Sequence, residues 1–334
     1  RTIKLYLRNK LILYTMVVMI LFNVLSNNTL FAMLQTYGST EPNINNPFAS
    51  ASSFQSKAAI LDNMPSHNVT VDDINIAYKQ MGYADGKPII LITGASSTMD
   101  MWNPLLLEAL ISANYKVIIF ENRGVGDSTV GTKDFSINQF ADDTLGLLNV
   151  LRIDKTDILG WSMGGFIAQQ LAATNPDRVS NLILYATSCG GSNDRPTPPE
   201  IIAIDKNTTM SQSEKMQKLA PMFFAPASWF EAHPDYTNYF PIPKEYPISQ
   251  QIHQKQLNAS TTWAGTCNTL SSINVPTLII VGTNDDPAPD SLTLADGIPG
   301  SWLIRIGEAG HALMYQHPDD FNRVLKTFLD INKE

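Results

Sequence analysis

A serine, an aspartate and a histidine of this chain have the types and surroundings that acyl-transfer chemistry requires. Ser162 lies in the motif Gly-Trp-Ser-Met-Gly at residues 160–164, and Asp285 and His311 follow it, each a few residues after an apolar run. A serine hydroxyl is a poor nucleophile until a base accepts its proton, and a carboxylate can orient that base. The three residues could therefore serve as nucleophile, orienting acid and general base.

Each of these residues follows a segment that predicts a buried strand. The segments are 156–161, 276–282 and 302–306, which are short, apolar and followed by turn-forming residues. Directly after the serine, Met163 to Thr174 has apolar residues on one face at helical spacing and ends before an Asn-Pro pair. A strand that turns sharply into a helix exposes the serine hydroxyl at the end of a sheet.

On these motifs the chain resembles the α/β-hydrolase family, in the branch of lipases, esterases and cofactor-free haloperoxidases. The chain order serine, aspartate, histidine is the order of that family. The resemblance runs from about Asn68 to Leu329. Three further segments support it: Leu-Ile-Thr-Gly at 91–94, Phe-Glu-Asn-Arg-Gly-Val-Gly-Asp-Ser at 120–128, and the form Gly-x-x-Asp-x-x-x-Pro at 282–289.

The distribution of strand and helix patterns predicts an α/β core interrupted by an insertion. The patterns alternate over 68–189 and return over 268–334, which indicates a mostly parallel sheet with helices on both faces. Residues 190–267 are rich in Pro, Ser, Gln and aromatic residues and are too long for a structureless loop. We expect a helical cap there, as the family resemblance implies. Most of its aromatic residues are expected to pack it onto the core.

The expected reaction needs an oxyanion hole as well as the three side chains. Ser162 would attack an acyl carbonyl, His311 would accept its proton, and Asp285 would support the imidazolium. The backbone N–H of Met163, at the start of the following helix, would bind the oxyanion. The backbone N–H of Ala95, in the loop after 91–94, is the expected second donor.

Two assignments have competitors in the sequence. Asp286 is the neighbour and rival of Asp285, with Asp194 a remote third, and the spacing of the Gly-x-x-Asp-x-x-x-Pro form favours Asp285. His317 competes with His311, but it stands before a proline and two aspartates, a pattern typical of a helix start. The other three histidines lie in the cap or in the linker before the core.

Two further residues near the expected site have structural interpretations. Many family members have a histidine where this chain has Thr93, so the hydrogen bonds that brace the oxyanion loop are expected to differ. Arg123, in the Arg-Gly-x-Gly segment, is expected to tie its loop through charge-assisted hydrogen bonds rather than to take part in catalysis.

Three functions fit these residues. The first is hydrolysis of a small to medium, largely apolar carboxylic ester. The alternatives are a cofactor-free haloperoxidase or perhydrolase with the same triad, and a non-catalytic member of the fold that binds a ligand. We expect no cofactor and no metal, since no His/Cys cluster has ligand spacing. The net charge of −8 becomes −12 when residues 1–32 are set aside, which argues against nucleic acid as a partner.

The N-terminal part predicts export from the cytoplasm. Residues 1–32 hold four basic residues, no acid and an apolar run from Leu11 to Leu25, as in a signal peptide or an N-terminal membrane anchor. Residues 33–67 have the composition of a flexible linker. An extracytoplasmic protein, secreted or attached to the membrane, could pair Cys189 with Cys267, although two free thiols fit the sequence equally well.

Overall fold

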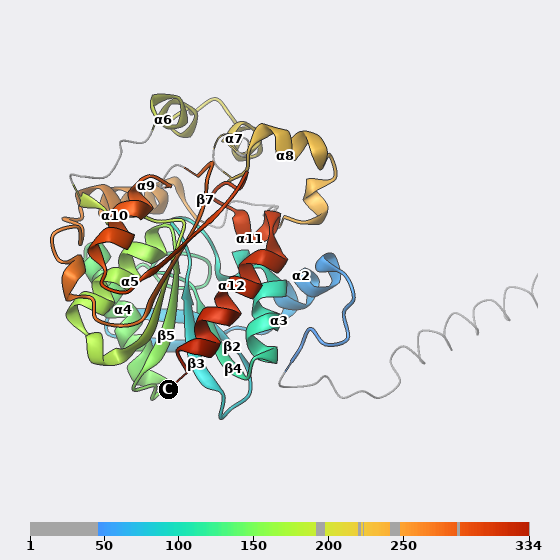
Figure 1. Ribbon diagram of the computed structural model, residues 1–334. Helices are drawn as coiled ribbons and strands as arrows, with labels where there is room; N and C mark the ends of the chain where they lie inside the picture. Colours follow the sequence, from blue (N-terminus) through green and yellow to red (C-terminus); the bar gives the residue numbers. More distant parts are fainter. Residues whose placement is uncertain are drawn as a thin grey trace, which may run out of the picture. The chain divides into compact units, whose positions relative to one another are not determined.

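The centre of the fold is an eight-stranded, mostly parallel sheet with the strand order β1-β2-β4-β3-β5-β6-β7-β8 (Figure 1). The computed structural model describes residues 46–191, 198–219, 222, 224–240, 248–285 and 288–333. The pairs β1/β2 and β2/β4 are antiparallel, and every other pair is parallel. The strands are β1 (His67–Val71), β2 (Ile74–Gly82), β3 (Lys87–Ile92), β4 (Tyr115–Phe120), β5 (Thr156–Trp161), β6 (Val179–Tyr185), β7 (Thr277–Gly282) and β8 (Trp302–Ile306).

Helices cover both faces of this sheet, as the alternating pattern predicts. On one face lie α3 (Pro104–Ser112) and α12 (Pro318–Ile331). On the other lie α4 (Ile137–Val150), α5 (Met163–Thr174) and α10 (Asp290–Gly297). Short elements join them: η1 (Met99–Met101), η2 (Pro176–Arg178), η6 (Leu270–Ser272) and α11 (Leu313–Gln316). The expected fold class, a mostly parallel α/β sheet with helices on both faces, is confirmed.

Neighbouring residues of each central strand enter different hydrophobic cores. In β3, Ile89 and Leu91 join the core under α3 and α12, whereas Ile90 and Ile92 join the core under α4 and α5; none of the four is exposed. A fully buried aliphatic side chain contributes about 1.5–3 kcal/mol to folding. Because both faces are covered, these strands are continuously apolar rather than alternating.

Part of the segment expected to be a linker, 33–67, is folded onto the core. Helix α2 (Phe54–Asn63) begins with a capping box between Ser53 and Ser56. Phe48 and Leu61 are 0% and 1% exposed. The linker prediction is therefore wrong for residues 48–64: the low apolar content hid a short amphipathic helix whose few large side chains are enough to dock it.

Helix α2 is also tied to the core by a buried cation. The ammonium of Lys57 donates to the carbonyl of Phe48 at 3.2 Å and to the carboxylate of Glu108 at 2.8 Å. The ring of Phe54 contacts that of Tyr315, with centroids 6.1 Å apart. The folded body therefore begins upstream of Asn68.

The expected cap region contains helices in its described residues. These are α6 (Pro199–Asp205), α7 (Gln212–Leu219), α8 (Ala227–Ala232), η5 (Tyr236–Asn238) and α9 (Gln250–Thr262). In Figure 1, α6, α7 and α8 lie together at one end of the sheet. We call residues 190–267 the cap. A disulfide between Cys189 and Cys267, with Cα atoms 5.1 Å apart, joins its two ends and settles the open question of pairing.

The signal peptide or anchor predicted over residues 1–32 lies outside the described residues. Among the residues that the structure describes, no helix has both the length and the hydropathy needed to cross a bilayer.

Candidate active site

Ser162 is the single residue between the end of β5 and the start of α5. Its backbone has φ 57° and ψ −121°, a conformation that non-glycine residues rarely adopt. Its amide donates to the carbonyl of Tyr185 in β6, and its carbonyl accepts from Gly165 N at 2.8 Å and from Thr187 Oγ1 at 2.9 Å. These three hydrogen bonds hold the strained turn in place.

The glycines of the motif are required by close packing. A Cβ atom on Gly164 would lie 2.0 Å from the carbonyl oxygen of Ile92, and one on Gly160 would lie 2.3 Å from the carbonyl oxygen of Gly164. Neither glycine has a positive φ, so the left-handed residue of the turn is the serine itself. The motif thus lets α5 approach β3 and β5 at backbone distance.

Asp285 and His311 meet in a buried hydrogen bond. Asp285 follows β7 and His311 follows β8, and the Nδ1 atom of His311 lies 2.8 Å from Oδ1 of Asp285. The two residues are 5% and 4% exposed. A carboxylate on Nδ1 fixes the tautomer and leaves Nε2 as the proton acceptor.

The loop that carries His311 is fixed to the strand that carries the serine. The carbonyl of His311 accepts hydrogen bonds from Tyr185 Oη at 2.7 Å and from Trp161 Nε1 at 3.2 Å. Trp161 directly precedes Ser162, and its ring centroid lies 5.8 Å from that of His311. Burial raises the pKa of Tyr185 well above its usual value, which keeps this phenol a donor. The three expected residues thus share one edge of the sheet.

The rival residues have other positions. His317 stands at the N-cap of α12, as its sequence context predicts. Asp286 and Asp194 lie outside the described residues. Among the described residues, no group of three or more His, Cys, Asp or Glu side chains could hold a metal ion.

The loop after β3 approaches Ser162 closely. A Cβ atom on Gly94 would lie 3.1 Å from the Cβ of Ser162 and 3.7 Å from its Oγ. Ala95 follows this glycine. Met163 is the first residue of α5, so its amide has no acceptor within the helix. Both expected oxyanion donors therefore belong to segments that border the serine.

Thr93 braces this loop. The buried Thr93 hydroxyl donates to the carbonyl of Ser97 at 3.1 Å. Its backbone carbonyl accepts from Asn122 Nδ2 at 3.4 Å. Thr93 thus ties the two ends of the loop to each other and to the loop after β4.

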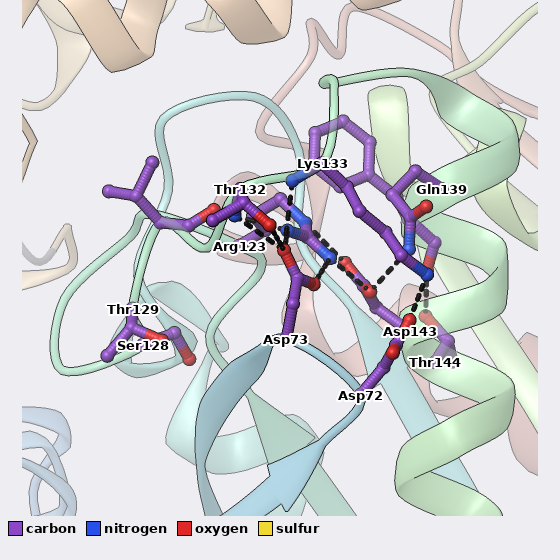
Figure 2. A network of polar contacts seen from close by, with 12 residues as sticks. Asp72, Asp73, Arg123, Ser128, Thr129, Thr132, Lys133, Gln139, Asp143 and Thr144 are labelled. Atoms are coloured by element: carbon purple, nitrogen blue, oxygen red, sulfur yellow. Dashed lines mark hydrogen bonds and ion pairs between the residues drawn. The ribbon is translucent and has the colours of Figure 1, made fainter.

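Arg123 is the centre of a buried ion-pair network on the loop after β4 (Figure 2). Its guanidinium donates to both carboxylate oxygens of Asp143, at 2.9 and 2.7 Å, and of Asp73, at 2.9 and 3.1 Å. The arginine holds the pKa of Asp73 well below its usual range. The geometry is that of a brace between the β1–β2 turn, this loop and α4.

Sequence reasoning missed two cap residues that touch the oxyanion loop. The amide of Ser96 donates to Gln256 Oε1 at 2.7 Å, and its hydroxyl lies 2.6 Å from His253 Nδ1. Both partners belong to α9 and are buried. The contacts span 160 and 157 residues of sequence, and no local pattern marks them.

Comparison with known proteins agrees with this fold. The model of the alpha/beta hydrolase fold family matches residues 87–318. A hydrolase of Pseudomonas putida, named for 2-hydroxy-6-oxononadienedioate and 2-hydroxy-6-oxononatrienedioate, is 30% identical over 272 residues, which is 77% of this chain and 92% of the relative.

Two further relatives cover similar parts of the chain. BpoC of Mycobacterium tuberculosis, which its name classes with non-heme bromoperoxidases, is 28% identical over 76% of this chain and 97% of its own. The solved structure of an alpha/beta hydrolase fold protein from Chitinophaga pinensis is 27% identical with a TM-score of 0.69, over 81% of this chain and 98% of that one. With its fold, its serine turn and these matches, the chain belongs to the α/β-hydrolase family of enzymes.

Proposed function

We propose that the protein is a serine hydrolase that cleaves a small to medium, largely apolar carboxylic ester through an acyl-enzyme on Ser162. The observation that carries the proposal is the buried hydrogen bond of 2.8 Å between His311 Nδ1 and Asp285 Oδ1. It leaves Nε2 of the imidazole as the atom that can accept the serine proton. The strained backbone of Ser162 is the second support, because strain of this kind is typical of nucleophiles on strand-to-helix turns.

In the proposed reaction, Ser162 Oγ attacks the ester carbonyl as its proton passes to His311. The tetrahedral oxyanion accepts hydrogen bonds from the amides of Met163 and Ala95, and each such donor is worth about 10²–10³ in rate. His311 then protonates the departing alcohol, and the acyl-enzyme remains. Water, deprotonated by the same histidine, attacks the acyl carbon and releases the acid.

The cap is rich in aromatic side chains, which suits an apolar substrate. Several of its aromatic rings contact one another and the core: Phe240 stacks on Tyr315 with centroids 4.7 Å apart and meets Trp229 and Phe224 edge-on. Phe224, Trp229 and Phe240 thus pack against the core. The proposed substrate is a small-molecule ester. We propose no nucleic-acid partner for the protein.

The second candidate is a cofactor-free haloperoxidase or perhydrolase, favoured by the similarity to BpoC. In that reaction, peroxide replaces water as the attacking group on the acyl-enzyme, so a peracid leaves instead of an acid. The same three side chains would serve. A non-catalytic ligand-binding role is the third outcome of the test below.

Covalent labelling tests the proposal. A fluorophosphonate probe should label Ser162 of the wild-type chain, should not label Ser162→Ala, and should label His311→Ala far more slowly. Peptide mapping would identify the modified residue. Absence of labelling on the folded wild-type protein would overturn the enzyme proposal and favour ligand binding. Esters of graded acyl length, assayed with water and with hydrogen peroxide, would then separate hydrolysis from perhydrolysis.

A location outside the cytoplasm, as a secreted or membrane-attached protein, is part of the proposal. The disulfide between Cys189 and Cys267 supports it, since such bonds persist mainly in oxidising compartments. Cell fractionation followed by thiol alkylation would test it. Recovery from the cytoplasm with both thiols alkylated would contradict it.

A further inference from the structure

We infer that His253 and Gln256 of the cap helix α9 are positioning residues that hold the oxyanion loop, residues 93–97, in its working geometry. This inference rests on the proposed function and deepens it. It gives the cap a part in transition-state binding beyond that of covering a pocket. Neither residue need touch the substrate for this role.

The two side chains hold Ser96 from two directions. Gln256 Oε1 accepts the Ser96 amide proton at 2.7 Å, and His253 Nδ1 lies 2.6 Å from the Ser96 hydroxyl. Gln256 is 0% exposed and His253 is 8% exposed, so solvent competes little for these contacts. Together they fix both the backbone and the side chain of the residue that follows Ala95.

The loop needs such an external restraint. Ser96 has a φ of 63°, a left-handed conformation that is unfavourable for a residue with a side chain. On the other side of Ala95 stands Gly94, which restricts the backbone least of all residues. The hydrogen bonds of Thr93 hold the ends of the loop at Thr93 and Ser97. The contacts from α9 add a restraint at Ser96, within one residue of the Ala95 N–H.

Helix α9 is itself anchored to the core, so it can act as a fixed support. At its start, Ile252 packs against Gly124: a Cβ atom added to Gly124 would lie 3.1 Å from Cγ2 of Ile252. At its end, the indole of Trp263 donates to Gln170 Oε1 in α5 at 3.2 Å. The disulfide at Cys267 follows a few residues later. Helix α9 therefore contacts the oxyanion loop through His253 and Gln256, and α5 through Trp263. Helix α5 is also the helix that begins at Met163.

The amide nitrogen of Gln256 also supports a positioning role for this residue. Nε2 is buried and has no hydrogen-bond partner among the described residues. A buried unpaired donor costs free energy and calls for an explanation. The other atom of the same amide, Oε1, is the one that binds the loop.

A matched pair of substitutions at position 256 tests the inference. Gln256→Met removes the acceptor at similar volume, whereas Gln256→Glu keeps an oxygen that can accept from Ser96. We expect kcat of Gln256→Met to fall about 10- to 100-fold, a fraction of the effect of losing an oxyanion donor, with little change in KM. Affinity for a trifluoromethyl ketone, which forms the tetrahedral adduct, should fall in parallel. Gln256→Glu should recover much of the loss.

Two controls separate positioning from general damage. Gln251→Met makes the same change on an exposed position of the same helix and should leave both kcat and ketone affinity at the wild-type level. The pair His253→Leu and His253→Asn repeats the comparison at the second contact, because asparagine can place a polar atom near the position of Nδ1. Circular dichroism and thermal unfolding would establish that each variant is folded.

The outcomes discriminate the inference from the proposed function. Wild-type kcat and ketone affinity in folded Gln256→Met and His253→Leu would overturn the inference while the labelling of Ser162 stood. A rise in KM with unchanged kcat would also overturn it, since that result indicates a pocket wall. If the wild-type protein itself failed to react with the fluorophosphonate, the proposed function would fall and the inference with it.

Discussion

His311 Nδ1 lies 2.8 Å from Asp285 Oδ1, and the partners come from loops that follow two adjacent parallel strands, β7 and β8. Adjacent parallel strands end at the same edge of a sheet, so residues 26 positions apart in sequence meet there without a long connection. The pair is buried, and its tautomer is set by the carboxylate.

The first prediction concerns the acid of this pair. Asp285→Asn should keep the shape of the site but favour the wrong imidazole tautomer, and kcat for ester hydrolysis should fall about 10⁴-fold. Steady-state kinetics on a chromogenic ester would measure it. Asp286→Asn is the matched control and should retain near wild-type kcat. The reverse result would transfer the role to the neighbouring aspartate.

The second prediction concerns Glu121, which lies 3% exposed at the end of β4. Desolvation by burial raises the pKa of Glu121 to about 8. The hydrogen bond from the Met99 amide lowers this pKa, but its effect is smaller than that of burial. The folded state therefore keeps a proton that the unfolded chain loses above pH 4–5. Stability should fall as pH rises through this range toward 8, by roughly 3–5 kcal/mol in total.

Glu121→Gln should remove that dependence, since the amide oxygen can still accept from Met99 and carries no charge. Urea unfolding at pH 5, 7 and 9 would show the gap between variant and wild type widening with pH. Glu231→Gln, on an exposed position of α8, should follow the wild-type curve. Parallel curves for Glu121→Gln and wild type would contradict the raised pKa.

The third prediction concerns the brace around Arg123. Arg123→Met leaves the carboxylates of Asp73 and Asp143 without their buried cation, and the free energy of unfolding should fall by about 3–5 kcal/mol. Lys133→Met removes the exposed partner of Asp72 and should cost less than about 1 kcal/mol. Chemical denaturation of the two variants would compare them. Equal, small losses would show that the network is not a brace.

The fourth prediction concerns the disulfide at the base of the cap. Replacing both Cys189 and Cys267 by serine should lower the stability by about 2–5 kcal/mol, because a loop with ends 78 positions apart is no longer closed in the unfolded chain. Thermal unfolding with and without reductant would measure it. The wild-type Tm should fall on reduction, while the double variant should not respond. A wild-type Tm that ignored full reduction would contradict the prediction.

Most of the sheet and its covering helices could be predicted from the sequence. The patterns placed β5 at Thr156–Trp161 and α5 at Met163–Thr174 with the bounds that the structure gives. These elements are strongly periodic or continuously apolar and are bounded by Gly, Asn or Pro. Local signals of this kind are sufficient to predict a strand or helix when its own composition determines that it is buried.

The features that sequence reasoning missed depend on contacts between distant segments. Helix α2 has few large apolar residues, and only its docking on α3 and Tyr315 makes it part of the core. The roles proposed for His253 and Gln256 arise from contacts with Ser96 across the cap. The pairing of the cysteines likewise needed the 5.1 Å separation of their Cα atoms. No periodicity within one segment encodes such distances.

The docking of α2 also determines where a shortened version of the protein can start. A chain cut at Asn68 would uncover the side of α3 that α2 packs on, leave Glu108 without Lys57, and remove the Leu61 carbonyl that accepts from the buried ammonium of Lys79. Truncated proteins for crystallisation or assay should therefore retain the residues from before Phe48 onward.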